Sequence, residues 1–219
     1  MKKNLIAAMT LTVMMAMTAC GGSSQPAATQ AAAASETAAA SEAAGEAAAP
    51  AGELKAIEAG VCETPALLTS IGQSADVDIV NTLCSKAGID LEKNNNITAD
   101  ELPADCKTLI LAVGGSSKGL GAAGIDADQE LERTAALLEK AKSQGTKIVA
   151  VHTGGSARRG TLSDSFIVPA FEAADIGVVV AEGDQDGLMQ GILAKNGASG
   201  AVVGQVAECV ATMTTLFGK

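Results

Sequence analysis

From residue 54 onward, short apolar runs alternate with longer segments that have the spacing of an amphipathic helix. The run 108–113 is almost continuously apolar, which is typical of a strand buried on both faces of a sheet. The segment 126–144 has the period of a helix that buries one face. Its expected buried positions are Leu131, Ala135, Leu138 and Ala141. Alternation of this kind predicts a parallel sheet covered by helices on both faces.

The other expected elements follow the same order along the chain. We expect strands at 66–71, 89–91, 108–113, 147–151 and 176–181. We expect helices at 76–87, 126–144, 163–174 and 185–195, and a short edge strand that runs into a helix over 202–217. The predicted fold is an α/β three-layer sandwich with a mainly parallel five-stranded sheet in the flavodoxin-like order 2-1-3-4-5. Residues 54–219 have the length of a single domain.

The first twenty residues have a different character. Lys2 and Lys3 precede an apolar run over 5–17, and small residues precede Cys20. This pattern resembles a bacterial lipoprotein signal with its lipobox, and the run is too short to span a membrane. The resemblance implies that residues 1–19 are a signal peptide and that Cys20 becomes the acylated, palmitate-bearing first residue. The protein is then expected on the extracytoplasmic face of a bacterial cell membrane, held through its N-terminal lipid.

Residues 21–53 are rich in Ala, with Ser, Thr, Gln, Glu, Gly and Pro, and contain no Leu, Ile, Val or Phe. A segment without these side chains cannot bury a core, so we expect a disordered tether. The predicted organisation is therefore a signal peptide at 1–19, the lipidated cysteine and tether at 20–53, and one α/β domain at 54–219.

The charge and the aromatic content of the chain disfavour some classes of ligand. It has 25 acidic and 15 basic residues, and two of the basic ones, Lys2 and Lys3, lie in the signal. An acidic mature chain repels nucleic acid, so we expect no nucleic-acid partner. Three Phe residues without Tyr or Trp give little surface for stacking flat ligands.

Four cysteines follow Cys20, namely Cys62, Cys84, Cys106 and Cys209. They form no CxxC pair and no cluster with metal-ligand spacing, so we expect no metal site. Two interpretations stay open: two disulfides, as in many exported proteins, or small buried thiols.

Glycine, hydroxyl and cationic residues concentrate where the predicted strands end. Ligands of parallel α/β sheets bind at these carboxyl ends, where glycines expose backbone N–H groups and helix N-termini attract anions. Lys and Arg add full positive charges. The candidate ligand-binding residues are Gly72, Gln73, Ser74, Gly114, Gly115, Ser116, Ser117, Lys118, Gly154, Gly155, Arg158 and Arg159. The alternative is that the glycines make turns and the basic residues pair with neighbouring acids.

Two motifs suggest other chemistry. Residues 115–119 spell GxSxG, which makes Ser117, with His152 and Asp126, a candidate hydrolase triad, and Ser74 is a second candidate nucleophile. Glycine continues to position 124, so we expect a loop after Ser117 where a nucleophile elbow needs a helix. Residues 119–124 spell GxGxxG but begin six residues after the strand, so we expect no dinucleotide and no cofactor.

Long strings at 69–76, 113–126 and 154–160 resemble an uncharacterised family of bacterial lipid-anchored or secreted proteins, defined as a domain of unknown function. The resemblance extends over about residues 65–187. It implies export and a flavodoxin-like or Rossmann-like domain, and it brings no reaction.

The leading hypothesis is a lipid-anchored extracytoplasmic protein that binds a small anionic solute at the strand ends and delivers it to a membrane transporter. We expect binding rather than catalysis. One alternative is an exported serine hydrolase that uses Ser117 or Ser74 with His152. Another is an envelope protein-interaction module without a small ligand.

Overall fold

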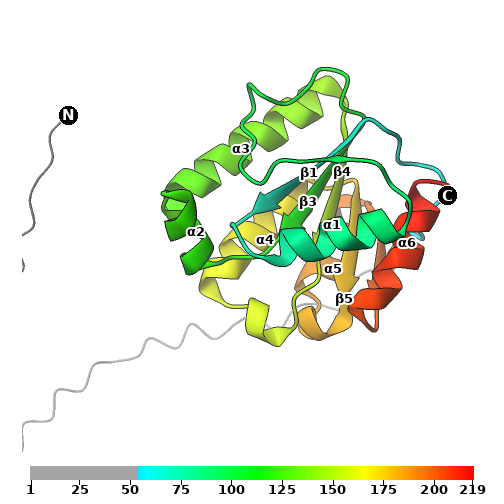
Figure 1. The fold of residues 1–219 in the computed structure, drawn as a ribbon. Coiled ribbons are helices and arrows are strands. Elements are labelled where there is room, and N and C mark those ends of the chain that lie inside the picture. The colour runs from blue at the N-terminus through cyan, green and yellow to red at the C-terminus, as the bar shows by residue number, and fades with distance from the viewer. Residues whose placement is uncertain (1–53) are drawn as a thin grey trace, which may run out of the picture. The chain divides into compact units, whose positions relative to one another are not determined.

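A six-stranded parallel sheet lies at the centre of residues 54–219, the part of the chain that this computed structural model describes (Figure 1). Its strand order is β2-β1-β3-β4-β5-β6, and every neighbouring pair is parallel. The strands are β1 (Ala66–Ile71), β2 (Glu92–Lys93), β3 (Thr108–Val113), β4 (Lys147–His152), β5 (Ile176–Val180) and β6 (Ser199–Val203). The α/β fold class is therefore confirmed, and the expected order 2-1-3-4-5 is present with β6 added at one edge.

Helices cover both faces of the sheet and give three layers. The α-helices are α1 (Asp76–Lys86), α2 (Ser117–Ala123), α3 (Ala127–Gln144), α4 (Thr161–Ala173), α5 (Leu188–Asn196) and α6 (Cys209–Leu216). Helices α1 and α6, which lie side by side in Figure 1, cover one face, and α3, α4 and α5 cover the other. Side chains of β3 alternate between the faces: Ile110 packs toward α1, and Leu109 and Leu111 pack toward α3 and α4.

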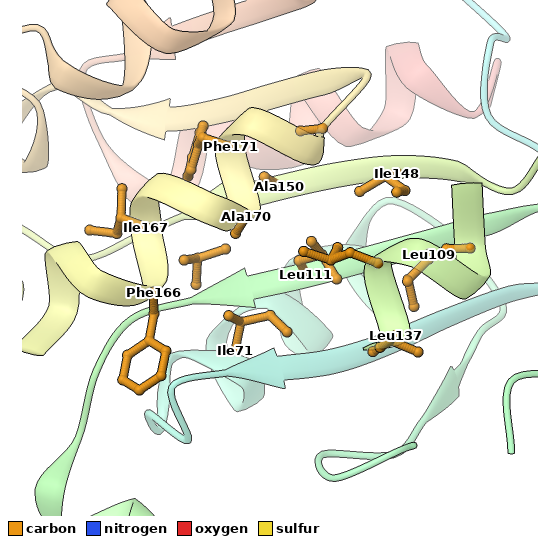
Figure 2. Packing of buried hydrophobic residues seen from close by; sticks show 14 of the residues in the cluster. Ile71, Leu109, Leu111, Leu137, Ile148, Ala150, Phe166, Ile167, Ala170 and Phe171 are labelled. Carbon is orange, nitrogen blue, oxygen red and sulfur yellow. The ribbon is translucent and has the colours of Figure 1, made fainter. Parts of the chain in front are cut away.

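The core between the sheet and α4 extends to the carboxyl end of β1. Figure 2 shows Phe166, Ile167, Ala170 and Phe171 of α4 over the sheet, with Phe166 beyond the end of β1 at Ile71. Phe166 is fully buried. A Cβ at Gly72 would lie 2.7 Å from Cδ2 of Phe166, so this aromatic ring packs directly against the loop after β1.

Three local expectations are corrected. The edge strand is Glu92–Lys93 and not 89–91, because Ile89 is buried in the core beside α1 and the strand pairs only after it. The expected loop after Ser117 is the helix α2, whose N-cap Ser116 accepts a hydrogen bond from the N–H of Gly119. In α3, Leu138 and Ala141 are buried and Leu131 packs against the core as expected, but Ala135 is exposed. The buried residues of α3 are Glu130, Thr134, Leu137, Leu138 and Ala141.

All four cysteines after Cys20 are free and buried, in agreement with the second of the two interpretations. Among residues 54–219, no helix has the length and apolarity needed to cross a bilayer. In the same part of the chain, no three His, Cys, Asp or Glu side chains gather where they could hold a metal ion. The predicted signal peptide, Cys20 and the tether lie outside the described residues.

Candidate functional site

The loops after β1 and β3 pack tightly against each other at the carboxyl end of the sheet. Gln73 has a φ of 56° and is the only non-glycine residue of the described chain with a positive φ. It forms an isolated antiparallel bridge with Gly115. Gly119, in the first turn of α2, lies so close that a Cβ at this position would be 1.7 Å from the carbonyl oxygen of Gln73. A glycine at 119 is therefore needed for α2 to pack against the loop after β1, which we call the β1 loop.

A buried ion pair on α3, between Glu130 and Arg133, also holds the β1 loop in place. Glu130 is fully buried, and its Oε1 accepts hydrogen bonds from the backbone N–H of Gly72 at 2.9 Å and from Nε2 of Gln73 at 3.1 Å. The guanidinium of Arg133 donates to the same carboxylate and to the carbonyl oxygen of Ser70. These bonds hold the Gly72–Gln73 turn in position, so α3 sets the geometry of the loop.

A groove of about 460 Å³ lies above these loops, and we call it the switch-point groove. Its polar lining consists of Gln73, Ser74, Asp78, Asn95, Asn96, Ser116 and Lys118. Val77, Ala122 and Ala123 add short apolar side chains. The groove lies between β1 and β3, where the strand order reverses direction, which is the usual ligand position in a parallel α/β sheet. In Figure 1, α2 lies at the end of the sheet toward which the arrow of β1 points.

The groove contains one unpaired cation and one paired acid. Lys118 is exposed, and no carboxylate of residues 54–219 lies within ion-pair distance of it. Asp78 also lines the groove, but its Oδ1 is bonded to Nζ of Lys93 at 2.6 Å. The positive charge of Lys118 is therefore available to a ligand.

Asp76 begins α1 beside the groove and is an unusual buried carboxylate. Its side chain is 6% exposed, and its Oδ2 has no hydrogen-bond partner among the described residues. Nε of Arg158 lies 3.8 Å from Oδ1, which is an ion pair but not a hydrogen bond. The side chain of Arg158 is 41% exposed.

Arg159 does not share a ligand with Arg158, because it is occupied by the protein itself. Its guanidinium donates to both carboxylate oxygens of Asp186 at 2.9 Å, to Asp164 at 2.8 Å and to the carbonyl oxygen of Gly183. The hydrogen bond to Asp186 is the main cause that raises the pKa of Arg159, and the same bond lowers the pKa of Asp186. In this structure Arg159 joins α4 to the loop after β5, as the alternative interpretation of the basic residues anticipated.

His152 ends β4 and is fully buried. Its Nδ1 lies 2.9 Å from the carbonyl oxygen of Val113 and donates to it, which leaves Nε2 as an acceptor without a partner among the described residues. A Cβ at position 183 would lie 2.8 Å from Nε2, so Gly183 gives the ring its space. Burial lowers the pKa of His152, although the bond to Val113 and the charge of Asp76 oppose the shift. The imidazole is therefore neutral at pH 7.

The candidate hydrolase residues lie in different environments. Ser74 is buried, and its Oγ accepts the backbone N–H of Asp76 at 3.1 Å. Ser117 is exposed at the start of α2, and Asp126 caps α3. In residues 54–219 no hydrogen bond joins His152 to Ser74, Ser117 or Asp126. The structure therefore holds no continuous chain of hydrogen bonds from a serine to the histidine.

The remaining predicted glycines pack against other parts of the site. Gly114 lies against Ser74 and Asp76, Gly115 donates its N–H to Ser163, Gly154 lies against His152 and Arg158, and Gly155 lies against Glu182. These contacts show that the glycines allow the strand-end loops to approach closely.

A larger hollow of about 520 Å³ lies at the opposite, amino-terminal edge of β1 and β2. Its charged lining residues are Asp90 and Glu92, and Cys106 contributes a buried thiol. An acidic lining without helix N-termini or a cation does not favour an anion, so we place the candidate site in the smaller switch-point groove.

Asp76, Glu130 and Arg133 are site residues that the sequence analysis did not single out. Glu130 carries the clearest signal, because it shares a helical face with Thr134, Leu137, Leu138 and Ala141. A charged residue on the buried face of an amphipathic helix needs a partner there. The i,i+3 spacing of Arg133 supplies that partner.

Several solved structures show limited similarity to the chain. The crystal structure of TesA has a TM-score of 0.29 and 13% identity, with 68% of this chain and 93% of that chain covered. A GDSL-like lipase from Bacteroides thetaiotaomicron has a TM-score of 0.29 and 10% identity, with 65% of this chain and 72% of that chain covered. AlinE4, an SGNH-hydrolase family esterase, has a TM-score of 0.29 and 12% identity, with 73% of this chain and 80% of that chain covered. Because these TM-scores are so low, we infer no shared activity from them.

No curated protein matches this sequence. The profile of the family described as Domain of unknown function (DUF6305) matches residues 63–217, which is most of the chain. The expectation of a family without an assigned reaction is confirmed: this chain belongs to the DUF6305 family.

Proposed function

We propose that this protein is a lipid-anchored extracytoplasmic protein that binds a small anionic solute in the switch-point groove. The observation that carries the proposal is the exposed, unpaired ammonium group of Lys118 in a groove whose one acid, Asp78, is already paired with Lys93. Its volume of about 460 Å³ falls in the range of small-molecule sites. In a chain with ten more acidic than basic residues, a local cation of this kind gives an anion a specific place to bind.

The architecture around the groove supports binding more than catalysis. The β1 loop is fixed by Glu130 and by the close packing of Gly119, so its polar groups are pre-organised. Arg158, which is only partly buried, supplies a second cation at the same end of the sheet. A rigid polar groove with Lys118 as its available cation can hold a carboxylate or a phosphate without further machinery.

The N-terminal features supply the cellular setting of the proposal. Acylation of Cys20 would attach the protein to the membrane, and residues 21–53 would hold the domain near its surface, where a transporter could receive the solute. We expect a Cys20→Ser variant to leave the membrane fraction and to appear with the soluble proteins. A variant that stays fully in the membrane fraction would contradict the lipid anchor.

A thermal-shift screen of the full chain in detergent tests the binding. We expect at least one small carboxylate or phosphate to raise the melting temperature, since a ligand at a hundred times its Kd adds about 2.7 kcal/mol of stability. Lys118→Ala should reduce the shift, and Lys140→Ala, which removes an exposed lysine from α3, should leave it unchanged. No shift with any compound would overturn solute binding and favour a protein-interaction module.

The serine hydrolase alternative gives a different result in the same preparation. It requires turnover of a p-nitrophenyl ester that is lost in His152→Asn and in either Ser117→Ala or Ser74→Ala. Solute binding predicts no such turnover, in agreement with the absence, within residues 54–219, of a hydrogen bond between His152 and either candidate serine.

A further inference from the structure

The ring of His152 lies between two loops at the carboxyl end of the sheet. Residues 153–160, which we call the β4 loop, follow β4, and residues 181–187, the β5 loop, follow β5. A Cβ at position 154 would lie 3.3 Å from Cε1 of the ring, and one at position 183 would lie 2.7 Å from its Cδ2. The ring therefore packs against one glycine of each loop.

One nitrogen of this ring has a hydrogen-bond partner and the other has none. Nδ1 donates to the carbonyl oxygen of Val113 at 2.9 Å, which leaves Nε2 as the acceptor nitrogen of a neutral imidazole. Nε2 is buried and has no partner within residues 54–219. A second proton on the ring would make Nε2 a donor without an acceptor and would place a charge in the interior. Both effects cost free energy.

The charged groups that face the ring do not supply the missing acceptor. Asp76 of α1 and Asp184 of the β5 loop favour a positive ring, and Arg159 of the β4 loop opposes it. The carboxylate of Asp184 is bonded to backbone N–H groups at the start of α5, and neither acid is a partner of Nε2. Burial has the largest influence and lowers the pKa of His152. Arg158, Asp164, Glu182 and Asp186 are the other charged residues of these loops and of the first turn of α4.

Arg159 joins the two loops around the neutral ring. Its Nη1 donates to the carbonyl oxygen of Gly183 at 2.6 Å, and its guanidinium donates to both carboxylate oxygens of Asp186 at 2.9 Å. The bond to Arg159 lowers the pKa of Asp186, so this pair stays charged in mild acid. A positive charge on His152 would repel Arg159 and would require water at Nε2, and both effects favour separation of the loops.

We propose that His152 is a pH-dependent switch, whose protonation separates the β4 loop from the β5 loop and admits water to Nε2 while the rest of the domain stays folded. In the open form the imidazole is in water and takes up a proton near its ordinary pKa of about 6.5. The closed form binds this proton only at lower pH, so each pH unit below 6.5 favours opening by about tenfold until the closed form is also protonated. The switch does not depend on solute binding.

Hydrogen–deuterium exchange of the full chain in detergent, followed by mass spectrometry, tests this inference. The measurements at pH 7.5 and pH 5.0 are compared after correction for the intrinsic exchange rate. At pH 5.0 we expect the bonded amides of the two loops, such as those of Arg158 and Asp184, to lose protection by about tenfold or more. The amides of α3 should keep their protection and serve as the internal control.

Two variants separate the titrating group from the contact that closes the loops. His152→Asn can still donate to Val113 but takes up no proton, so it should show the same loop protection at both pH values. Arg159→Gln loses the ion pair with Asp186, so its loops should be unprotected already at pH 7.5.

Three results would overturn the switch. Equal loop protection at pH 7.5 and pH 5.0 in the unmodified chain would show that protonation does not open the loops. An equal loss of protection in the loops and in α3 would show that acid unfolds the whole domain, and neither of these comparisons needs a variant to fold. A pH effect that persists in a folded His152→Asn variant would assign the titration to a group other than His152.

Discussion

The carboxylate of Glu130 lies 2.8 Å from the guanidinium of Arg133 and accepts the backbone N–H of Gly72 through the same oxygen. This relationship joins α3 to the loop after β1, although the two segments are 58 residues apart in the sequence. Arg133 also donates to the carbonyl oxygen of Ile97, in the segment after β2. The pair therefore connects three of the segments that surround the switch-point groove.

Removing Arg133 should destabilise the protein strongly. In Arg133→Met, Glu130 is left as a buried charge without its cation, so we expect a loss of about 3–5 kcal/mol in the free energy of unfolding. The double variant Glu130→Gln/Arg133→Met should recover part of the loss, because the stranded charge is gone. Urea denaturation measures both, with Lys140→Ala as a surface control within about 0.5 kcal/mol of the unmodified chain. A double variant no more stable than Arg133→Met would contradict this explanation.

Two glycines of α2 should respond oppositely to the same substitution. In Gly119→Ala, the new Cβ would meet the carbonyl of Gln73, so we expect α2 to shift and stability to fall by about 1–3 kcal/mol. In Gly121→Ala, nothing lies within 4 Å of the new Cβ, and stability should rise by about 0.5–1 kcal/mol, because alanine favours helix. The melting temperatures of the two variants test this contrast. Similar effects in both would show that α2 does not pack against the β1 loop as described.

The only histidine of the chain should make stability depend on pH below about 6.5, the ordinary pKa of histidine. Burial lowers the pKa of His152 in the folded protein, so the unfolded chain binds a proton first as the pH falls below 6.5. The stability that neutral His152 contributes is present above pH 6.5 and is lost as the pH falls toward the folded-state value, by about 1.4 kcal/mol for each unit of the shift. His152→Asn, which can still donate to Val113, should flatten this part of the pH profile. An unchanged slope would contradict the buried neutral imidazole.

The four buried thiols should be unreactive in the folded protein. Burial raises the pKa of Cys62 and Cys209 to about 11 and that of Cys84 to about 12, and it also raises the pKa of Cys106. Thiolates are the reactive species, so iodoacetamide at pH 8 should label these residues only after unfolding. Mass spectrometry of native and unfolded samples measures the labelling. Rapid native labelling, or a melting temperature lowered by reductant, would contradict four free buried thiols.

Most of the fold could be predicted from the sequence because its signals are local. The apolar runs at β1 and β3 and the helical period of α3 follow directly from residue spacing, and Gly145 and Gly197 end helices in the left-handed conformation as glycine allows. Helix α2 was missed because its glycines oppose helix formation locally. Packing against Gln73 and capping by Ser116 outweigh that preference.

The candidate site was predicted less completely, because its key contacts join distant segments. The sequence correctly placed Gln73, Ser74, Ser116 and Lys118 at strand ends, and these residues line one groove. Nothing local in the sequence shows that Arg159 is bonded to Asp186, 27 residues away. The buried, unsatisfied carboxylate of Asp76 also becomes visible only when β3 and α1 are placed together.

The most direct test of solute binding at the switch-point groove is an NMR titration of the full chain with whichever solute the thermal-shift screen identifies. We predict that the largest amide shifts occur at Gln73, Ser74, Ser116 and Lys118 and that Lys118→Ala weakens binding. Shifts centred on the amino-terminal hollow, at residues such as Thr64, Asp90 and Cys106, would contradict the account.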